Sequence, residues 1–287
     1  TSLSISGTTN LGANVTTTAV GGQTYSGAVT ITGSAVTLDS TSGNGPVLFS
    51  STVNSAANVG NTASAANPLT VTTGSGNVTF TGVVGGGTNG ALGALTVNST
   101  GTTTFSAAVT AASVTTNAGG TTAINGGTIT TTGAQTYNDA VTLGAATTLT
   151  SSGSGNINLA STVNGAQTLT INTAGTTTFG GIVGGTTALT SITTDAAGSL
   201  AINGGAITTT GAQTYNDAVT LGAATTLSAS SITTGSTFNA STYAATFTTD
   251  AIALGGNLSG SGALTIQPKT ASATIGIGSA ASGTLSL

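Results

Sequence analysis

The chain has 287 residues and a formal net charge of −4, because five Asp and one Lys are its only charged side chains, and it contains no His or Cys. Without His or Cys there is no ordinary zinc site and no Ser-His or Cys-His nucleophile, and a single Lys cannot line a groove that binds phosphates. We therefore expect no enzyme, no metal site, no cofactor, no nucleic-acid partner and, since no apolar run reaches about 18 residues, no membrane insertion of this segment.

Strands are predicted along the whole chain. Threonine occurs 68 times and glycine 45 times; Thr, Val and Ile favour strands, and glycine supplies the positive φ that tight turns need. The clearest strand-like runs lie at 36–40, 68–73, 77–84, 94–99, 168–172 and 189–194. Asn-Gly pairs lie at 44–45, 89–90, 125–126, 164–165 and 203–204. We expect these Asn residues to form turns, with an inward-facing ladder as the alternative for a minority of them.

The sequence repeats itself. Residues 123–149 recur at 201–227 with one change, Thr128 to Ala206, and a weaker copy lies at 21–32. Such self-similarity is the signature of a solenoid, so we expect residues 1–287 to form a single continuous β-solenoid. Region 228–287 departs from the repeat and is expected to hold either degenerate coils or the start of another block.

A shorter pattern occurs inside this repeat: an aromatic residue or Leu is followed four residues later by Val. Stacked coils would bring equal positions of the pattern into inward-facing columns. The predicted structural ladder consists of Tyr25, Phe49, Phe80, Phe105, Tyr137, Leu159, Phe179 and Tyr215, with Val29, Val53, Val84, Val109, Val141, Val163, Val183 and Val219. The fold class that follows is all-β, a parallel β-helix with coils of about 20–25 residues, stacked at the spacing of parallel strands.

The Asp residues do not form a promising catalytic pair. Cleavage of a glycosidic bond needs two carboxyl groups roughly 5–9.5 Å apart. Asp139 and Asp217 occupy the same position in the two copies, which three or four coils would separate by roughly 14–19 Å. Asp195 precedes Asp217 by about one coil, but we expect it in a different part of the unit.

The segments at 130–150 and 169–198, TTTGAQTYNDAVTLGAATTLT and LTINTAGTTTFGGIVGGTTALTSITTDAAG, resemble the β-strand repeats of very large secreted bacterial proteins. They are similar to filamentous-haemagglutinin-type adhesins and to the passenger β-helices of autotransporters, over most of residues 20–230. The resemblance implies a right-handed β-helical fibre that is exported and displayed at the bacterial cell surface or in the biofilm matrix. It assigns no functional residue to this chain.

We therefore expect an extracellular structural fibre or stalk, either part of a giant surface adhesin or a self-associating filament subunit. Self-association is expected because little charge opposes stacking. The alternative is an adhesin module that binds glycans or another surface, through its outward faces or an inserted loop such as 54–68. A remote alternative is ice binding, prompted by TTT clusters at 102–104, 130–132, 176–178 and 208–210, whose spacing is irregular.

Overall fold

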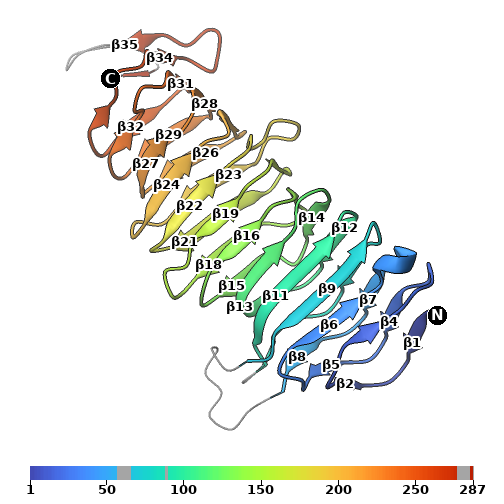
Figure 1. The fold of residues 1–287 in the computed structure, drawn as a ribbon. Helices are drawn as coiled ribbons and strands as arrows, with labels where there is room; N and C mark the ends of the chain where they lie inside the picture. Colours follow the sequence, from blue (N-terminus) through green and yellow to red (C-terminus); the bar gives the residue numbers. More distant parts are fainter. Residues whose placement is uncertain (57–65, 88–89, 277–284, 287) are drawn as a thin grey trace. The chain divides into compact units, whose positions relative to one another are not determined.

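The computed structural model, which describes residues 1–56, 66–87, 90–276 and 285–286, is all-β, with parallel strands stacked as a β-solenoid of about 13 turns (Figure 1). This confirms the predicted fold class. The chain divides into two compact units, Thr1–Gly155 (unit 1) and Asn156–Leu287 (unit 2), which are described separately. The near-identical segments 123–149 and 201–227 lie one in each unit.

In unit 1 each coil adds a short strand to three parallel ladders, which we call faces A, B and C. Face A consists of β1 (Leu3–Ile5), β4 (Gln23–Tyr25), β7 (Val47–Phe49), β10 (Val78–Phe80), β12 (Thr102–Phe105), β14 (Thr121–Ile124) and β17 (Ala140–Leu143). Face B consists of β2 (Thr9–Leu11), β5 (Val29–Ile31), β8 (Val53–Ser55), the first half of β13 (Val109–Thr116), β15 (Thr128–Thr131) and β18 (Thr147–Ser151). Face C consists of β3 (Val15–Thr16), β6 (Val36–Asp39), β9 (Leu69–Gly74), β11 (Leu92–Ser99), the second half of β13 and β16 (Gln135–Tyr137).

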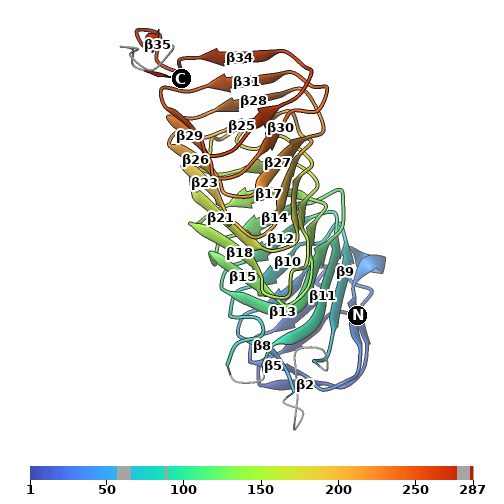
Figure 2. The ribbon, with the colours of Figure 1, turned by 90° about the vertical axis from the view of Figure 1, so that its left-hand side faces the viewer.

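Unit 2 is built in the same way, from three parallel ladders that we call faces D, E and F. Face D consists of β19 (Ile157–Leu159), β22 (Thr176–Phe179), β24 (Ser199–Ile202), β27 (Ala218–Leu221), β30 (Phe238–Asn239) and β33 (Leu258–Ser259). Face E, whose last four strands Figure 2 shows stacked, consists of β20 (Val163–Asn164), β25 (Ala206–Thr208), β28 (Thr225–Ser228), β31 (Ala245–Thr248) and β34 (Leu264–Gln267). Face F consists of β21 (Thr168–Thr173), β23 (Ser191–Thr194), β26 (Ala212–Tyr215), β29 (Ser231–Thr234) and β32 (Ile252–Leu254).

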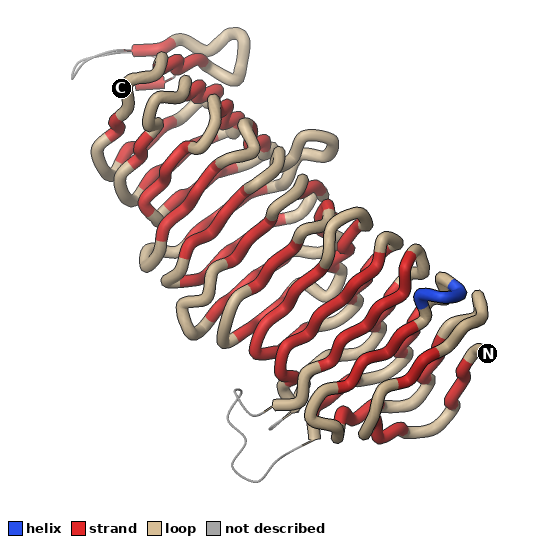
Figure 3. Tube along the Cα trace, viewed as in Figure 1, coloured by secondary structure: helices blue, strands red, loops and turns tan. Residues whose placement is uncertain are grey.

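Two further elements lie outside these ladders. The 3-10 turn η1 (Thr41–Gly43) is the only helical segment among the described residues (Figure 3), and none of them forms a helix long and apolar enough to cross a membrane. The short strands β35 (Ile275–Gly276) and β36 (Leu285–Ser286) pair with each other. In region 228–287 the ladders of faces D, E and F therefore continue as far as Gln267.

The coils differ in length, although their strands stay in register. On face A, Phe49 pairs with Phe80, Phe80 with Phe105, and Phe105 with Ile124, so each of these coils is shorter than the one before it. The expected coil length of about 20–25 residues thus covers only part of the observed range of coil lengths. The residues that lengthen a coil are accommodated between its strands. Coil boundaries therefore cannot be found by counting a fixed period along the sequence.

The core consists of the inward side chains of the three faces in each unit. Residues along a strand alternate between buried and half-buried, as in β9, because successive side chains point to opposite sides of a strand. Where coils turn, their backbones come very close: a Cβ at Gly204 would lie 2.0 Å from the carbonyl oxygen of Gly181 in the preceding coil. Only glycine leaves room for this approach.

Candidate functional site

In unit 1, eight residues of the predicted ladder form two columns. Tyr25, Phe49, Phe80 and Phe105 are consecutive partners on face A, and Val29, Val53, Val84 and Val109 are consecutive partners on face B. The four aromatic rings stack with centroids 4.9–5.4 Å apart and interplanar angles of 8–16°. Burial of each such side chain contributes about 1.5–3 kcal/mol, and stacked rings add about 0.5–1.5 kcal/mol for each pair.

Phe80 and Val84 show how the four-residue pattern arises. Both side chains are fully buried, but Phe80 lies on face A and Val84 on face B, so a corner separates them. The pattern therefore marks a corner of the coil. In unit 2 the same arrangement pairs Leu159 with Phe179 on face D and Val163 with Val183 on face E.

Tyr137, Val141, Tyr215 and Val219 are equally buried but do not join these columns. Tyr137 lies on face C opposite Thr116, Val141 on face A opposite Thr122, Tyr215 on face F opposite Thr194, and Val219 on face D opposite Leu200. The reason is coil length. In unit 1 the residue that follows Phe105 in its column is Ile124, so the chain has already turned two corners when it reaches Tyr137.

Each buried Tyr has a neighbour that the sequence analysis missed, the Gln two residues before it. The hydroxyl groups of Tyr25, Tyr137 and Tyr215 donate to Oε1 of Gln23, Gln135 and Gln213 at 2.8, 2.9 and 3.0 Å. Burial raises the pKa of all three hydroxyls above the ordinary value for Tyr. The available signal was the triplet Gln-Thr-Tyr, which occurs three times, because a recurring amide beside a buried phenol supplies its hydrogen-bond partner.

The Gln side chain also joins neighbouring coils. Nε2 of Gln135 donates to the carbonyl oxygen of Ile129 in its own coil at 3.2 Å and to that of Thr150 in the next coil at 2.9 Å. Nε2 of Gln213 does the same with Ile207 and Ser228, both at 3.0 Å. One buried amide thus bonds to two backbone carbonyls and to the adjacent phenol, whose hydroxyl would otherwise be unpaired in the core.

Several Asn side chains connect one coil to the next. Oδ1 of Asn44 accepts from the backbone N–H of Ser75 at 3.0 Å, and Oδ1 of Asn164 accepts from those of Thr186 and Thr187 at 2.9 and 3.1 Å. Asn44 is also in the left-handed conformation, with φ of 49°. Asn44 thus combines the expected turn with a bond between coils. Of the other predicted Asn-Gly turns, that at 89–90 involves Asn89, which lies outside the described residues.

The Asp residues divide into half-buried and fully buried ones. Hydrogen bonds from Thr41 hold the pKa of Asp39 below its usual value, and those from Thr270 do the same for Asp250. Asp139 and Asp217 are each only 1% exposed, and burial raises the pKa of both carboxyl groups. Within the described residues, no three side chains of the metal-ligating types come together.

The expected separation of Asp195 from Asp217 is wrong. Thr194 pairs with Tyr215 across face F, so Asp195 lies opposite Asn216 in the neighbouring coil, and its charge acts on Asp217. The two segments, TTDAAG and YNDAVT, lie side by side because the strands that precede them are in register. Asp217 is nevertheless buried, so the two carboxyl groups are not both accessible to an external polymer.

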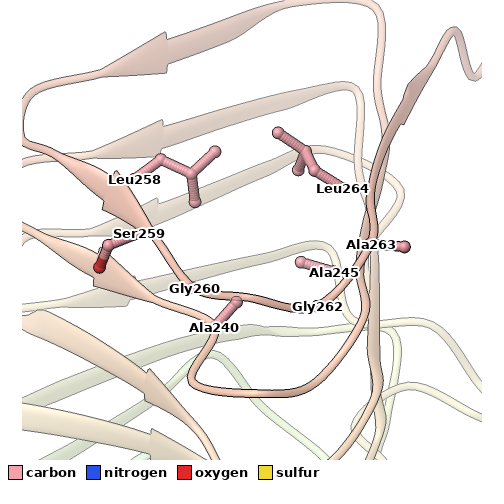
Figure 4. A pocket seen from close by; sticks show the side chains of 8 residues that line it. All are labelled: Ala240, Ala245, Leu258, Ser259, Gly260, Gly262, Ala263 and Leu264. Atoms are coloured by element: carbon pink, nitrogen blue, oxygen red, sulfur yellow. The ribbon is translucent and has the colours of Figure 1, made fainter.

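Among the residues that the structure describes, nothing covers part of the inward surface of the coil at 252–267. Leu254 is 39% exposed and Leu264 50%, although their partners in the preceding coil, Thr234 and Ala245, are buried. A cavity of about 110 Å³ lies here between Leu258 and Leu264, as Figure 4 shows. The cavity is lined by Ala240, Ala245, Leu258, Ser259, Gly260, Gly262, Ala263 and Leu264. Its side chains are apolar except for the hydroxyl of Ser259, and it carries no titratable group.

The outward faces carry columns of threonine. On face C, successive partners are Thr37, Thr70, Thr96, Thr115 and Thr136, and on face F they are Thr170, Thr193, Thr214 and Thr233. No side-chain hydroxyl of either column is hydrogen-bonded to another described residue. The TTT clusters that prompted the ice-binding alternative do not form these columns, because they lie on different faces. Their irregular spacing in the sequence therefore does not describe the columns, which are regular. Of the predicted binding loop 54–68, residues 57–65 lie outside the described residues.

These features define two candidate functional surfaces: the exposed inward surface of coil 252–267, and the threonine columns. No family model, curated protein or solved structure matches the chain.

Proposed function

We propose that this chain is a structural, non-enzymatic segment of an extracellular fibre or stalk, displayed at the bacterial cell surface or in the biofilm matrix. It would serve either as part of a giant surface adhesin or as a self-associating filament subunit. Support comes from the use of its buried side chains: the aromatic and Val columns, the Gln amides and the Asn side chains all join one coil to the next.

The observation that carries this proposal is the exposed surface of coil 252–267. Its inward residues continue columns that are fully buried in the preceding coil, since Leu258 pairs with Phe238 and Ile266 with Phe247. A strand edge without a partner favours addition of another strand, and no charged side chain occurs in 252–267. A further coil, of the same polypeptide or of a second copy, would bury Leu254 and Leu264.

The first experiment is the mass of the native polypeptide under denaturing conditions, together with negative-stain images of undenatured material. A mass far above 26.7 kDa would support one stretch of a giant covalent solenoid. Long fibres assembled from a 26.7 kDa polypeptide would support a filament subunit. A 26.7 kDa polypeptide that stays monomeric at high concentration would contradict both forms of the proposal.

A matched pair of variants then tests the surface itself. Leu264→Asp places a charge in the uncovered core and should abolish association through this surface, because a buried, unpaired carboxylate is costly. Thr265→Asp adds the same charge at the adjacent outward position and should leave association intact. Self-association of each variant and of the unmodified chain is measured by analytical ultracentrifugation. If both variants self-associate as strongly as the unmodified chain does, stacking at this surface is ruled out.

A second candidate function, adhesion to a glycan or another repeating surface, is favoured by the threonine columns. Their hydroxyl groups recur once in every coil, about 4.8 Å apart, and make no hydrogen bond within the described protein. Binding on a glycan array that is lost in the Thr96→Val and Thr115→Val double variant would support this role. The same columns keep ice binding as a remote alternative, which a measurement of thermal hysteresis decides.

A further inference from the structure

The two near-identical segments place a buried Asp at the same position but give it different neighbours. Asp139 lies in the copy at 123–149 and Asp217 in the copy at 201–227, and each is 1% exposed. The neighbours differ because they come from the residues just before each copy, where Asn117 and Thr122 in unit 1 correspond to Asp195 and Leu200 in unit 2.

In unit 1 both oxygens of the carboxyl group have partners. Oδ1 of Asp139 accepts from the backbone N–H of Gly120 at 2.8 Å, and Oδ2 accepts from the hydroxyl of Thr122 at 3.2 Å. Oδ1 of Asn117 accepts from the backbone N–H of Ser99, so this neighbour carries no charge. These hydrogen bonds favour the ionised form of Asp139, since a buried carboxylate needs hydrogen bonds to replace those from water, although burial is the larger cause and raises the pKa of Asp139 as well.

In unit 2 the second oxygen of the carboxyl group has lost its partner. Oδ1 of Asp217 still accepts from the backbone N–H of Gly198 at 2.9 Å, but Leu200 cannot donate a hydrogen bond. Oδ2 of Asp217 and the nearby hydroxyl of Thr194 are both buried without a hydrogen-bond partner among the described residues. The Thr194 side chain lowers the pKa of Asp217 without offsetting burial, the dominant cause that raises it.

The charges around Asp217 act in the same direction as burial. On the strands packed against this coil, β23 and β24 before it and β29 and β30 after it, the single adjoining charged group is Asp195, whose carboxylate repels a charge on Asp217. The only other titratable group of its own coil is Tyr215, whose hydroxyl is bonded to Gln213. Lys269, the one basic side chain of the chain, bonds to the carbonyl oxygen of Thr209.

We propose that the protonation of Asp217 controls how tightly its coil packs in unit 2, and we call this residue a proton-controlled joint. The coil packs fully against its neighbours when the carboxyl group is protonated and loosens when that group is ionised. In the closed state the carboxyl has taken one proton from solvent, and its Oδ2–H donates to the hydroxyl oxygen of Thr194. Ionisation returns this proton to solvent and leaves a buried charge beside Asp195. The corresponding joint at Asp139 should depend less on pH, because Thr122 and Gly120 both donate to its carboxylate, although burial raises the pKa of this group too.

The expected pH dependence follows from the direction of the pKa shift. A carboxyl whose pKa is raised by folding binds more protons in the folded than in the opened state, so the free energy of opening falls as pH rises above the ordinary Asp value of about 3.9. The decline ends once pH exceeds the raised pKa. The joint is therefore strongest in acid, and it acts independently of whether the chain forms fibres.

Hydrogen exchange of the two copies tests this with an internal control. The segments 129–149 and 207–227 have the same sequence, so their intrinsic exchange rates cancel at every pH. Peptides extended through Thr150 or Ser228 can be told apart by mass. Between about pH 4 and pH 7, protection of the second copy should fall relative to the first, roughly tenfold for each unit by which the pKa of folded Asp217 exceeds that of folded Asp139. A constant ratio would overturn the proposal.

Two reciprocal variants assign the effect to the missing hydroxyl. Leu200→Thr should weaken the pH dependence of the second copy, and Thr122→Leu should strengthen that of the first. Asp217→Asn should remove it altogether, with protection at pH 7 at least as high as that of the unmodified chain. If Leu200→Thr leaves the pH profile of the second copy unchanged, the proton-controlled joint is wrong. It is also wrong if added Ca²⁺ restores protection at pH 7 in the unmodified chain but not in Asp217→Asn, and that result would assign a cation site instead.

Discussion

The two near-identical segments adopt the same local structure in two different units. Every strand of 123–149 has a counterpart in 201–227, and the contacts recur: Tyr hydroxyl to Gln at 2.9 and 3.0 Å, and the Asn138 and Asn216 amides to backbone carbonyls at 2.8 Å in both. The two segments differ in the hydrogen bonding of Oδ2 of Asp139 and Asp217. The difference arises because the preceding coil supplies Thr122 in unit 1 and Leu200 in unit 2. In a solenoid, a side chain's environment thus depends on a residue about one coil away as much as on its own segment.

The largest effect should come from removing the buried ring in either copy. Tyr137→Ala and Tyr215→Ala should each destabilise the chain by about 3–5 kcal/mol, as expected when a buried aromatic side chain is deleted. The effects should be equal, because the two rings have the same burial and the same Gln partner. Denaturant unfolding followed by circular dichroism measures them.

Tyr243 supplies the control for these variants, since its side chain is 39% exposed. Tyr243→Ala should change stability by no more than about 0.5 kcal/mol. If the losses of stability in Tyr137→Ala and Tyr215→Ala differ by more than about 1 kcal/mol, residues outside the copies also determine the stability of the core. The two copies would then not be equivalent in their packing.

A smaller but equally matched loss should follow from removing the buried amides. Gln135→Leu and Gln213→Leu put an apolar side chain of similar size in place of the amide. Each variant removes the bonds of the amide to backbone carbonyls and leaves a buried Tyr hydroxyl unpaired, which costs about 1–3 kcal/mol. Gln267→Leu is the control, because the amide of Gln267 is exposed. If all three variants unfold at the denaturant concentration of the unmodified chain, the bonds between coils do not stabilise the solenoid.

The smallest effect should come from exchanging the one residue that differs between the copies. Thr128 and Ala206 both lie at outward positions of their strands, so Thr128→Ala and Ala206→Thr should each change stability by no more than about 0.5 kcal/mol. Thermal unfolding of the two single variants checks this. A larger shift would show that the outward surface of face B or face E is involved in a contact.

The sequence was sufficient to predict the all-β class, the parallel coils and the burial pattern, because Val, Thr and Phe alternate along strands and recur from coil to coil. It also placed Phe49, Phe80 and Phe105 in one column. It did not place Tyr137, because the short coil from Phe105 to Ile124 keeps the same register as the long coil from Phe49 to Phe80. Counting residues therefore cannot reveal how many corners separate two positions.

The features that the sequence analysis missed are contacts between coils. The role of Gln135 depends on the carbonyl oxygen of Thr150, and that of Asp217 on Leu200 and Asp195. Each of these partners lies in a neighbouring coil, at a sequence separation that the variable corners change from coil to coil. The residue types alone carried part of this information, since a recurring Gln beside a buried Tyr is a polar pair that requires partners.

The variable corners also affect how such a chain can evolve. Lengthening a surface loop costs little, about 0.6 kcal/mol for each doubling of its length, and on face A the long step from Phe49 to Phe80 keeps the same column as the short step from Phe105 to Ile124. Insertions and deletions can therefore accumulate at corners while selection holds the inward columns constant. Related chains would then be recognised by the order and chemistry of their columns, because the distance between repeats would no longer be shared.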